Sequence, residues 1–538
     1  MKNGRNMGLE LNKSSWACLI ISFIIFLALL AYIWKFTVDD AYITFRYALH
    51  LAQGFGIVWN VGESPVEGYS NFLWVIIASV LIKLNMDPVL FTKIIGIGAL
   101  IGTLYIYWKI ATEVFHDKKL YSAAFAIAAA LLLINPATAI HTVSGLETMP
   151  YTLFVLILSY LSYKLIKSFN KQTLYFFAFI SLICSILRPE GMLISMGLFI
   201  LIYFMVINKN KVDESKIKTI LPFILVYLFP IAIYMAFRMY YFNEIFPLPF
   251  LVKTVTNGSI GSGIYKLSEA IKYIAPLLIV ILIAFINRIE PIFYDREGIY
   301  KRLRVILITM ATTIIFADII YVFSSLYMNY AQRFYYPSFV LIYILTGISL
   351  VVLLHEMKNS FKIENLKQLS KYAGFLIVFL LLMSNLGFVS DYSYLNNCSE
   401  RFPVSYVSLG TELNEFSDLN LTFASIDSGS LPYFSNWNQI DMAGLNDKFI
   451  AKNGFATEDY LQKSHPELII ILSGDGTNPA GTTVQQPFIK YAEENGFVKL
   501  PAVYYKKEYY LLPYLDPKVP EFEKIKAAIL RAALTSWK

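Results

Sequence analysis

Long hydrophobic stretches recur through the first 390 residues of the chain and do not recur after them. The first, from Trp16 to Trp34, has no formal charge and is long enough to cross a bilayer at about 1.5 Å per residue. The pattern therefore predicts a polytopic α-helical membrane protein. Its spans are expected near 16–36, 69–84, 88–110, 120–134, 149–166, 173–187, 191–207, 219–240, 272–287, 304–324, 337–354 and 373–390.

The basic residues of the loops predict how these spans are oriented. Lys2, Arg5 and Lys13 favour a cytoplasmic N-terminus, and HDKK at 116–119 favours a cytoplasmic loop, because Lys and Arg are enriched on that side. An even number of crossings must then separate the two, yet three candidate spans lie between them. One of the short early segments is accordingly expected not to cross. We expect about eleven crossings in all, within a range of ten to thirteen.

The last part of the chain, residues 391–538, has the pattern of a soluble α/β domain that follows a transmembrane domain at 1–390. LTFASID (421–427) and PELIIILSG (466–474) are apolar runs that end at turn residues, which predicts short buried strands. KYAEENGF (490–497) is predicted to be a helix that stops at glycine. The count of crossings puts this domain outside the cytoplasm, in the periplasm.

Composition supports the membrane assignment and narrows the class of partner. The 538 residues are 57% hydrophobic, 16% aromatic and only 15% charged, unlike an ordinary soluble protein. The net charge of +7 comes largely from loop lysines and arginines and indicates topology, so no nucleic-acid partner is predicted. Two of the three cysteines, Cys18 and Cys184, lie in apolar spans, so no disulfide framework is expected.

Two adjacent acids, Asp39 and Asp40, open the predicted outer loop 37–68. A helix that begins at Asp39 would carry Arg46 and His50 on the same face, with Asp40 about a quarter-turn away beside Tyr47. One interpretation is a membrane-parallel helix that presents these groups to a shared cavity. The other is a surface helix in which the acids only stabilise its first turn.

Further polar residues fall at the outward ends of the predicted spans. They are Glu67, Glu147, Arg188, Glu190, Arg238, Lys253 and Arg333. Charges at membrane depth are costly, so they are expected to pair with one another or to line a water-filled cavity. The set mixes acids with Lys and Arg, which bind phosphate, and several members lie beside Pro or Gly. Both features favour a cavity.

These residues stand in sequences that resemble a known superfamily. The stretch DDAYITFRYALHLAQGFGIVWNVGESPVEGYSNFLW is similar to the first outer loop of GT-C glycosyltransferases that use polyprenyl-phosphate sugars. The similarity continues through SGLET, RPEG, RMYYFNEIFPLPFLVK and QRFYYP, and through SIDSGSLPYFSNWNQIDMAGLND at 425–447. The nearest likeness is to the AftB-like group, the terminal arabinofuranosyltransferases.

The resemblance implies an inverting membrane glycosyltransferase at the outer face of a bacterial inner membrane. It would move one sugar from a polyprenyl-phosphate donor to a cell-envelope glycan or glycolipid. Asp39 would be the base, with Asp40 orienting the acceptor or holding a metal. Lys253, Arg333, Arg46 and Arg188 are candidates for the donor phosphate. The candidates for acceptor or sugar binding are Glu67, Tyr69, Glu147, Glu190, His50, Asp427 and Tyr433.

Several alternatives stay open at this point. A transporter or flippase of a lipid-linked saccharide would also place charges in a membrane cavity, but it predicts polar groups near the bilayer midplane and often repeated halves. No halves repeat in this chain. No residue is assigned as a metal ligand, although the two adjacent acids could hold a divalent cation. The sugar, the acceptor and the linkage do not follow from the sequence.

Overall fold

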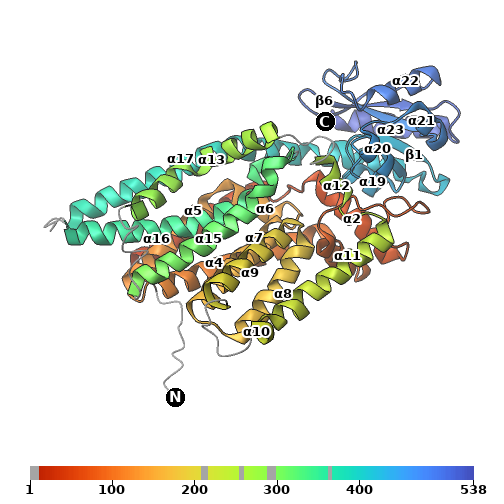
Figure 1. Ribbon diagram of the computed structural model, residues 1–538. Helices are drawn as coiled ribbons and strands as arrows, with labels where there is room; N and C mark the ends of the chain where they lie inside the picture. The colour runs from red at the N-terminus through yellow and green to blue at the C-terminus, as the bar shows by residue number, and fades with distance from the viewer. Residues whose placement is uncertain are drawn as a thin grey trace.

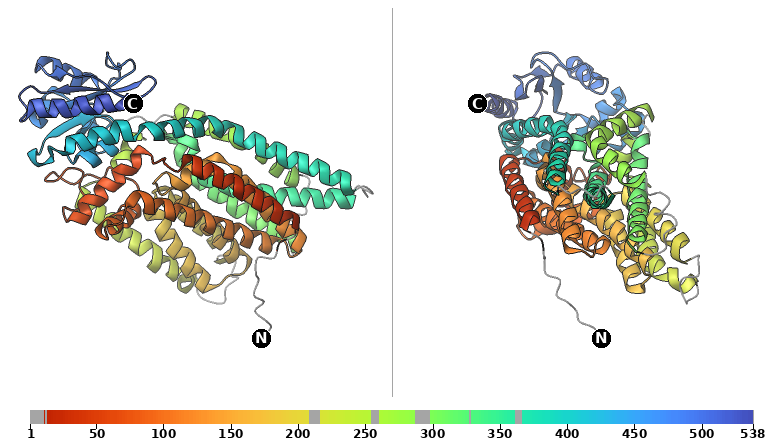
Figure 2. Two further views of the ribbon diagram at one scale, coloured as in Figure 1. Left: turned by 180° about the vertical axis from the view of Figure 1, so that it is seen from behind. Right: turned by 90° about the vertical axis from the view of Figure 1, so that its left-hand side faces the viewer.

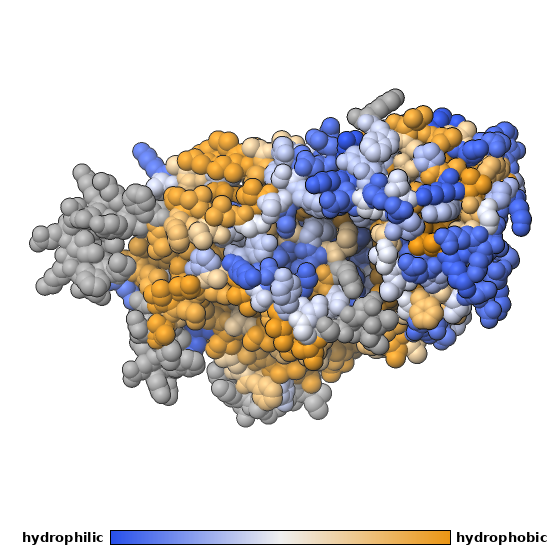
Figure 3. Space-filling model, turned by 90° about the horizontal axis from the view of Figure 1, so that it is seen from above, coloured by the Kyte–Doolittle hydropathy of each residue, from blue (hydrophilic) through white to orange (hydrophobic). Residues whose placement is uncertain are grey.

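A bundle of long helices carries a mixed α/β region at one end (Figure 1; Figure 2). The computed structural model describes residue 11 and residues 13–207, 216–253, 260–286, 298–326, 328–360 and 366–537. Apolar residues dominate the visible surface of the bundle, whereas hydrophilic residues dominate that of the α/β region (Figure 3). On the first helix, Ile20, Ile21 and Ile24 are more than half exposed, as expected of side chains that face lipid. The predicted fold class is confirmed.

Nine helices of the described residues are long and apolar enough to cross a membrane. They are α1 (Lys13–Ile33), α4 (Pro88–Val114), α7 (Thr148–Lys167), α9 (Glu190–Ile202) with η1 (Tyr203–Ile207), α10 (Lys216–Phe223) with η2 (Ile224–Leu228) and α11 (Phe229–Phe242), α13 (Ile260–Ile286), α15 (Gly298–Asp318) with η4 (Ile319–Phe323), α16 (Tyr336–Ser360), and α17 (Leu366–Arg401). Side-chain caps start several helices: Asp87 accepts from the Val89 backbone before α4, and Asn170 accepts from Gln172 and Thr173 before α8 (Lys171–Leu187).

The helix α3 (Phe72–Lys83) is the shortest of the three early candidate spans. Its 12 residues span about 18 Å, well short of a hydrocarbon core of about 30 Å. If the pair α5 (Lys118–Ile134) and α6 (Pro136–Val143), bent by 67°, is one span, the described residues hold ten candidate crossings. Ten is the lower end of the predicted range. The expected eleven would also need α8, whose 17 residues make it shorter than the other candidates.

The α/β region is built on a six-stranded sheet of order β2-β1-β3-β6-β4, with β5 paired to β6. Parallel pairing joins β1 (Thr422–Ser425) to β2 (Asn438–Asp441) and to β3 (Leu468–Ser473). Antiparallel pairing joins β6 (Tyr509–Leu515) to β3, to β4 (Val498–Lys499) and to β5 (Val503–Lys506). Its helices are η6 (Pro403–Val407), α18 (Ser408–Asn414), η7 (Ser417–Leu419), α19 (Ser430–Ser435), α20 (Lys448–Asn453), α21 (Glu458–Ser464), α22 (Gln486–Glu494) and α23 (Phe522–Ser536).

The sequence predicts these elements with small differences. Strands β1 and β3 lie within the predicted strand segments, and α22 ends just before Gly496 as expected. The helix α17 runs past residue 390, where the sequence pattern puts the domain boundary, and ends at Arg401. Three segments between the spans gather at the end of the bundle that meets the α/β region: α2 (Asp39–Gln53), α12 (Leu248–Leu251) and η5 (Tyr330–Gln332) (Figure 1).

The centre of the bundle tolerates no added volume where α16 meets α5. A Cβ atom at Gly347 would lie 2.5 Å from the Ala124 carbonyl oxygen. We therefore predict that Gly347→Ala destabilises the protein by about 1–3 kcal/mol, the usual cost of overpacking, as a lower melting temperature in detergent. Gly98→Ala in α4 is the control, because its new methyl group meets open space. Equal melting temperatures for the two variants would contradict this packing.

Candidate active site

The first turn of α2 carries the two adjacent acids, and the helix begins at Asp39 as predicted. Val38 is extended before it, and the helix ends at Gly54, whose φ of 90° closes the last turn. Two carboxylates in the first turn face the positive end of the helix dipole, which stabilises them. Because successive residues on a helix diverge by about 100°, the two carboxylates have different surroundings.

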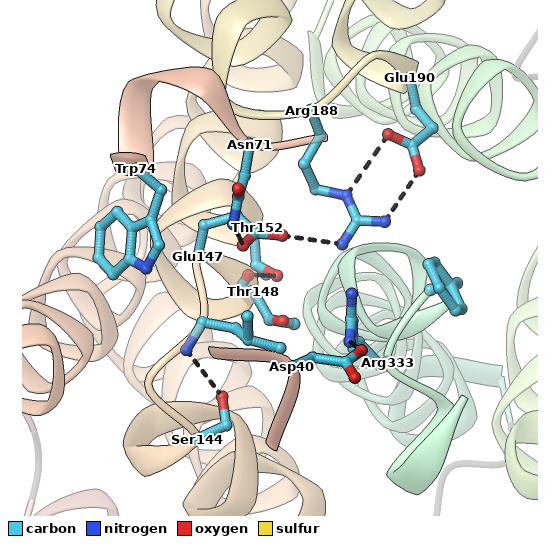
Figure 4. Close-up of polar contacts among 12 residues, drawn as sticks. Asp40, Asn71, Trp74, Ser144, Glu147, Thr148, Thr152, Arg188, Glu190 and Arg333 are labelled. Carbon is cyan, nitrogen blue, oxygen red and sulfur yellow. Dashed lines mark hydrogen bonds and ion pairs between the residues drawn. The ribbon is translucent and has the colours of Figure 1, made fainter. Parts of the chain in front are cut away.

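Asp40 faces a small cavity between α2 and the membrane bundle (Figure 4). The cavity measures about 50 Å³, and Tyr69, Glu147, Lys253 and Arg333 also line it. The Arg333 guanidinium donates to Asp40 over 3.2 Å. Two of the predicted phosphate-binding residues and one of the acids thus meet at this point.

A buried network of ion pairs lies next to this cavity (Figure 4). Arg188 donates to Glu147 over 3.2 Å and to Glu190 over 2.9 Å. Asn71 donates to Glu147 over 2.7 Å, and the Tyr321 hydroxyl donates to Glu190. Buried charges are stable only when they are paired and hydrogen-bonded in this way. Glu147 and Glu190 therefore hold Arg188 in place.

Lys253 is a cation of the site that makes no ion pair with a described residue. It lines a second cavity of about 70 Å³ together with Arg188, Arg333 and Glu190. Among the described residues, no carboxylate lies within ion-pair distance of its ammonium group, which instead lies 5.5 Å from the centre of the Phe334 ring. Burial, followed by the charge of Arg333, lowers the pKa of Lys253 to about 8. Three cations and one carboxylate line this cavity, so an anion would be bound favourably there.

The loop that carries Arg333 has a strained backbone. Met328, Ala331 and Gln332 have φ values of 59°, 45° and 54°, a region that residues other than glycine seldom adopt. The Ala331 backbone is held on both sides, because its N–H donates to Asp391 over 3.2 Å and its carbonyl lies 3.0 Å from a ring nitrogen of His141. Strain that the surroundings maintain in this way is common at functional sites.

Asp39 faces the α/β region. Its carboxylate accepts hydrogen bonds from the backbone N–H groups of Gly429 (3.0 Å) and Ser430 (2.9 Å) and from the Ser430 hydroxyl (2.6 Å). Burial, and then the charge of Asp427, raise the pKa of Asp39 to about 7. The loop before α19 packs closely against the start of α2, since a Cβ atom at Gly429 would lie 2.1 Å from the Asp39 carbonyl oxygen.

Asp39 also lines the largest cavity at this junction, about 220 Å³ between α2, α17 and the β5–β6 hairpin. Asp427 lines it too and accepts hydrogen bonds from the hydroxyls of Tyr406 and Tyr509. Adjacent acids in the sequence thus open onto two different cavities. Asp40 lines the cavity that Lys253 and Arg333 also line, and Asp39 lines one that tyrosines and Asp427 surround.

Other predicted site residues lie elsewhere and have structural partners. Arg46 donates to the carbonyls of Trp59 and Trp437, both at 2.9 Å, and so joins the outer loop to the α/β region. His50 contacts the Val58 carbonyl at 2.9 Å, and burial lowers its pKa to about 4. Glu67 pairs with Arg238 at 2.7 Å. None of these side chains lines the three cavities described above.

Tyr433 packs against the ring of Tyr42 at 5.4 Å and does not line them either. Conversely, Asn71, Tyr321 and Ser430 bind the charged groups of the site but were not predicted. These neutral residues carry no signal in the sequence. Among the described residues, no three His, Cys, Asp or Glu side chains are grouped to hold a metal ion.

Comparison with solved structures identifies similar folds. ArnT from Cupriavidus metallidurans bound to undecaprenyl phosphate matches with a TM-score of 0.54 at 9% identity, covering 95% of this chain and 100% of ArnT. The same protein in the apo state gives 0.52 at 11% identity, covering 94% and 98%. The archaeal oligosaccharyltransferase AglB from Archaeoglobus fulgidus, in complex with an inhibitory peptide and a dolichol-phosphate, gives 0.48 at 13% identity, covering 97% and 78%.

The similarity to ArnT establishes the GT-C type of fold that the sequence predicts. Residues 400–518 match the model of a domain of unknown function, DUF8728. A comparison with curated protein sequences finds no match.

The contact between Asp39 and Gly429 predicts a stability effect that needs no change of charge. Gly429→Ala should push α19 away from α2 and lose hydrogen bonds to a carboxylate, which are worth about 1.5–3 kcal/mol each. We expect a lower melting temperature and faster proteolysis between the bundle and the α/β region. Gly474→Ala, whose Cβ meets open space in the same region, is the matched control. Unchanged proteolysis of Gly429→Ala would argue against this docking.

Proposed function

We propose that the protein is an inverting glycosyltransferase that moves one sugar from a polyprenyl-phosphate donor to a glycan or glycolipid acceptor. The observation that carries this proposal is the division of the acid pair between two cavities. Asp40 opens onto a cavity that Lys253 and Arg333 also line, and these two cations line a second cavity with Arg188. The described lining of the cavity beside Asp39 has no arginine. A displacement reaction needs its leaving group and its nucleophile on opposite sides of the reacting carbon.

The cavities that Lys253 and Arg333 line are suited to the donor phosphate. As the bond from the anomeric carbon to the phosphate oxygen breaks, its electron pair remains on the phosphate and negative charge grows there. Cations already in position stabilise that charge without further reorganisation. Lys253 makes no ion pair among the described residues, and Arg333 could exchange Asp40 for the phosphate. The ligand of the matching ArnT structure, undecaprenyl phosphate, is of this chemical class.

The cavity beside Asp39 is suited to the acceptor and to the base that activates it. Asp39 would take the proton of the acceptor hydroxyl while the hydroxyl oxygen forms its bond to the anomeric carbon. A carboxylate with a pKa of about 7 is a stronger base than an ordinary aspartate and is still ionised in part at neutral pH. The three donors from Gly429 and Ser430 would fix its orientation. Asp40 would instead position Arg333.

The cellular setting of the proposal follows from the loop charges. With a cytoplasmic N-terminus and an odd number of crossings, such as the eleven that the sequence predicts, the α/β region would lie at the outer face of a bacterial inner membrane. The polar groups of the site gather at that end of the bundle, which favours transfer over transport of the saccharide. The resemblance of the outer loop to the AftB-like group favours addition of a single terminal sugar to a cell-envelope polymer.

Replacing the proposed base gives a specific kinetic prediction. Asp39→Asn should lower kcat by about 10²–10⁴-fold, the usual contribution of a general base. It should also lower the melting temperature, because the amide oxygen can keep the two hydrogen bonds from Ser430 but the amide NH₂ group cannot accept the one from Gly429. In the wild type, kcat/KM should rise with pH up to about 7, where Asp39 becomes ionised, and Asp39→Asn should lose this dependence. Asp87→Asn is the control, because Asn also caps a helix. Turnover of Asp39→Asn at the wild-type rate would refute the assignment.

The same pKa has the opposite effect on stability. The folded protein holds the proton of Asp39 more tightly than the unfolded chain, because its pKa is raised from 3.8 to about 7. The contribution of this group to stability is therefore complete at low pH and is lost as the pH rises from about 4 through about 7. Ionising the base for catalysis thus costs stability.

The donor assignment predicts a binding effect that does not need turnover. Lys253→Met should weaken binding of undecaprenyl phosphate to the purified protein at least tenfold, or about 1.4 kcal/mol, because it removes a cation that makes no ion pair among the described residues. Lys272→Met removes an exposed lysine that pairs with Glu269 and should bind as the wild type does. Equal affinity of Lys253→Met and the wild type would exclude Lys253 from the phosphate site.

A further inference from the structure

The cavity beside Asp39 lies where three parts of the chain meet. The linker 36–39 before α2, the helix α17 and the β5–β6 hairpin contribute most of its lining, and the strained loop contributes Met328 and Tyr330. Its volume of about 220 Å³ is small for a drug-sized ligand, for which pockets begin near 300 Å³. It is of a size for one small ring.

Hydrogen-bonding groups on aromatic rings give this cavity its character. Five tyrosines, Tyr330, Tyr394, Tyr406, Tyr505 and Tyr509, belong to its lining, together with Asp39 and Asp427. Carboxylates accept hydrogen bonds only, while phenols both donate and accept. Such a lining matches a ligand that offers several hydroxyl groups and an apolar ring face.

The charge of the cavity disfavours an anionic ligand. Lys506 is the one cation among the described residues of its lining, and it is already engaged. Its ammonium group lies 4.5, 5.2 and 5.0 Å from the ring centres of Tyr394, Tyr505 and Tyr509 and donates to the Tyr394 hydroxyl. Two carboxylates against one engaged ammonium group would repel a phosphate or a uronate.

We propose that this cavity binds the terminal sugar of the acceptor, and that this sugar is neutral. Tyr505 and Tyr509 of the β5–β6 hairpin, with Asp427, would hold its hydroxyls and turn one of them toward Asp39. The inference rests on the proposed function, because only a transferase has an acceptor. The binding of a neutral sugar ring by these residues can be tested without any transfer.

Neighbouring residues of β5 provide a matched pair of variants. Tyr505 lines the cavity, whereas Tyr504 stacks on Trp537 of the C-terminal segment at 4.9 Å and does not line it. The probes are methyl hexopyranosides, methyl pentofuranosides and the corresponding methyl uronates, whose binding to the purified full-length protein is measured by saturation-transfer NMR. Undecaprenyl phosphate binding is measured in the same samples.

We expect at least one neutral glycoside to bind the wild type and Tyr504→Ala, with at least tenfold weaker binding to Tyr505→Ala. The uronates should bind more weakly than the neutral glycosides, and undecaprenyl phosphate should bind all three proteins equally. Tyr505→Phe, which keeps the ring, serves if Tyr505→Ala does not fold and should show a smaller loss. The proposal is overturned if no neutral glycoside binds the wild type, or if both Tyr505 variants bind it as the wild type does.

The two proposals fail in different ways. If Tyr505→Ala loses the glycoside but the protein never transfers sugar from a lipid phosphate, the cavity stands as a sugar site and the proposed function falls. If transfer proceeds with an unchanged acceptor KM in Tyr505→Ala, the proposed function stands and the acceptor is bound elsewhere.

Discussion

The arrangement of the site depends on how the first turn of α2 is held between the bundle and the α/β region. Its two carboxylates lie next to each other in the chain, but one is fixed by backbone N–H groups of the α/β region and the other by a guanidinium from the bundle. Arg46 and Asn60 strengthen the same junction through the carbonyls of Trp437 and Gln439. Removing either support would let the helix turn, and both acids would leave their cavities together.

Electrostatic cost explains why so many charges at this end are paired. Arg188 has two carboxylate partners, and Glu67 has Arg238. A buried charge that loses its partner costs about 3–5 kcal/mol, so these pairs are essential to the fold whatever they contribute to the reaction. Lys253 differs from these residues, since no carboxylate among the described residues lies within ion-pair distance of its ammonium group. Its charge is therefore the most available of the group to a bound anion.

Local patterns in the sequence predict the fold well and the site only in part. Hydrophobic length locates the spans. A parity argument from loop charges predicts that one early segment does not cross, and α3, with 12 residues, is short for a span. The start of α2, the strands β1 and β3 and the meeting of Asp40 with Lys253 and Arg333 follow from the sequence as well. These features can be predicted because each depends on a few neighbouring residues or on which side of the membrane a loop lies.

What the sequence leaves open depends on contacts between distant segments. Arg46 resembles a phosphate ligand in the sequence because its charge lies near the acids. Its guanidinium group instead donates hydrogen bonds to carbonyls of the outer loop and of the α/β region. The partners of Asp39 are Gly429 and Ser430, about 390 residues away and of ordinary type. Nothing in the composition of those residues distinguishes them from any other turn.

The last long helix gives the junction a mechanical property. The stretch Leu376–Asn414 is helical over 39 residues and leads from the bundle directly into the α/β region. A covalent connection of this kind behaves as a rod and not as a tether, so the α/β region cannot swing open on it without bending or breaking the helix. A large substrate would then have to reach these small cavities without such an opening, which favours the tip of a polymer over a site within its length.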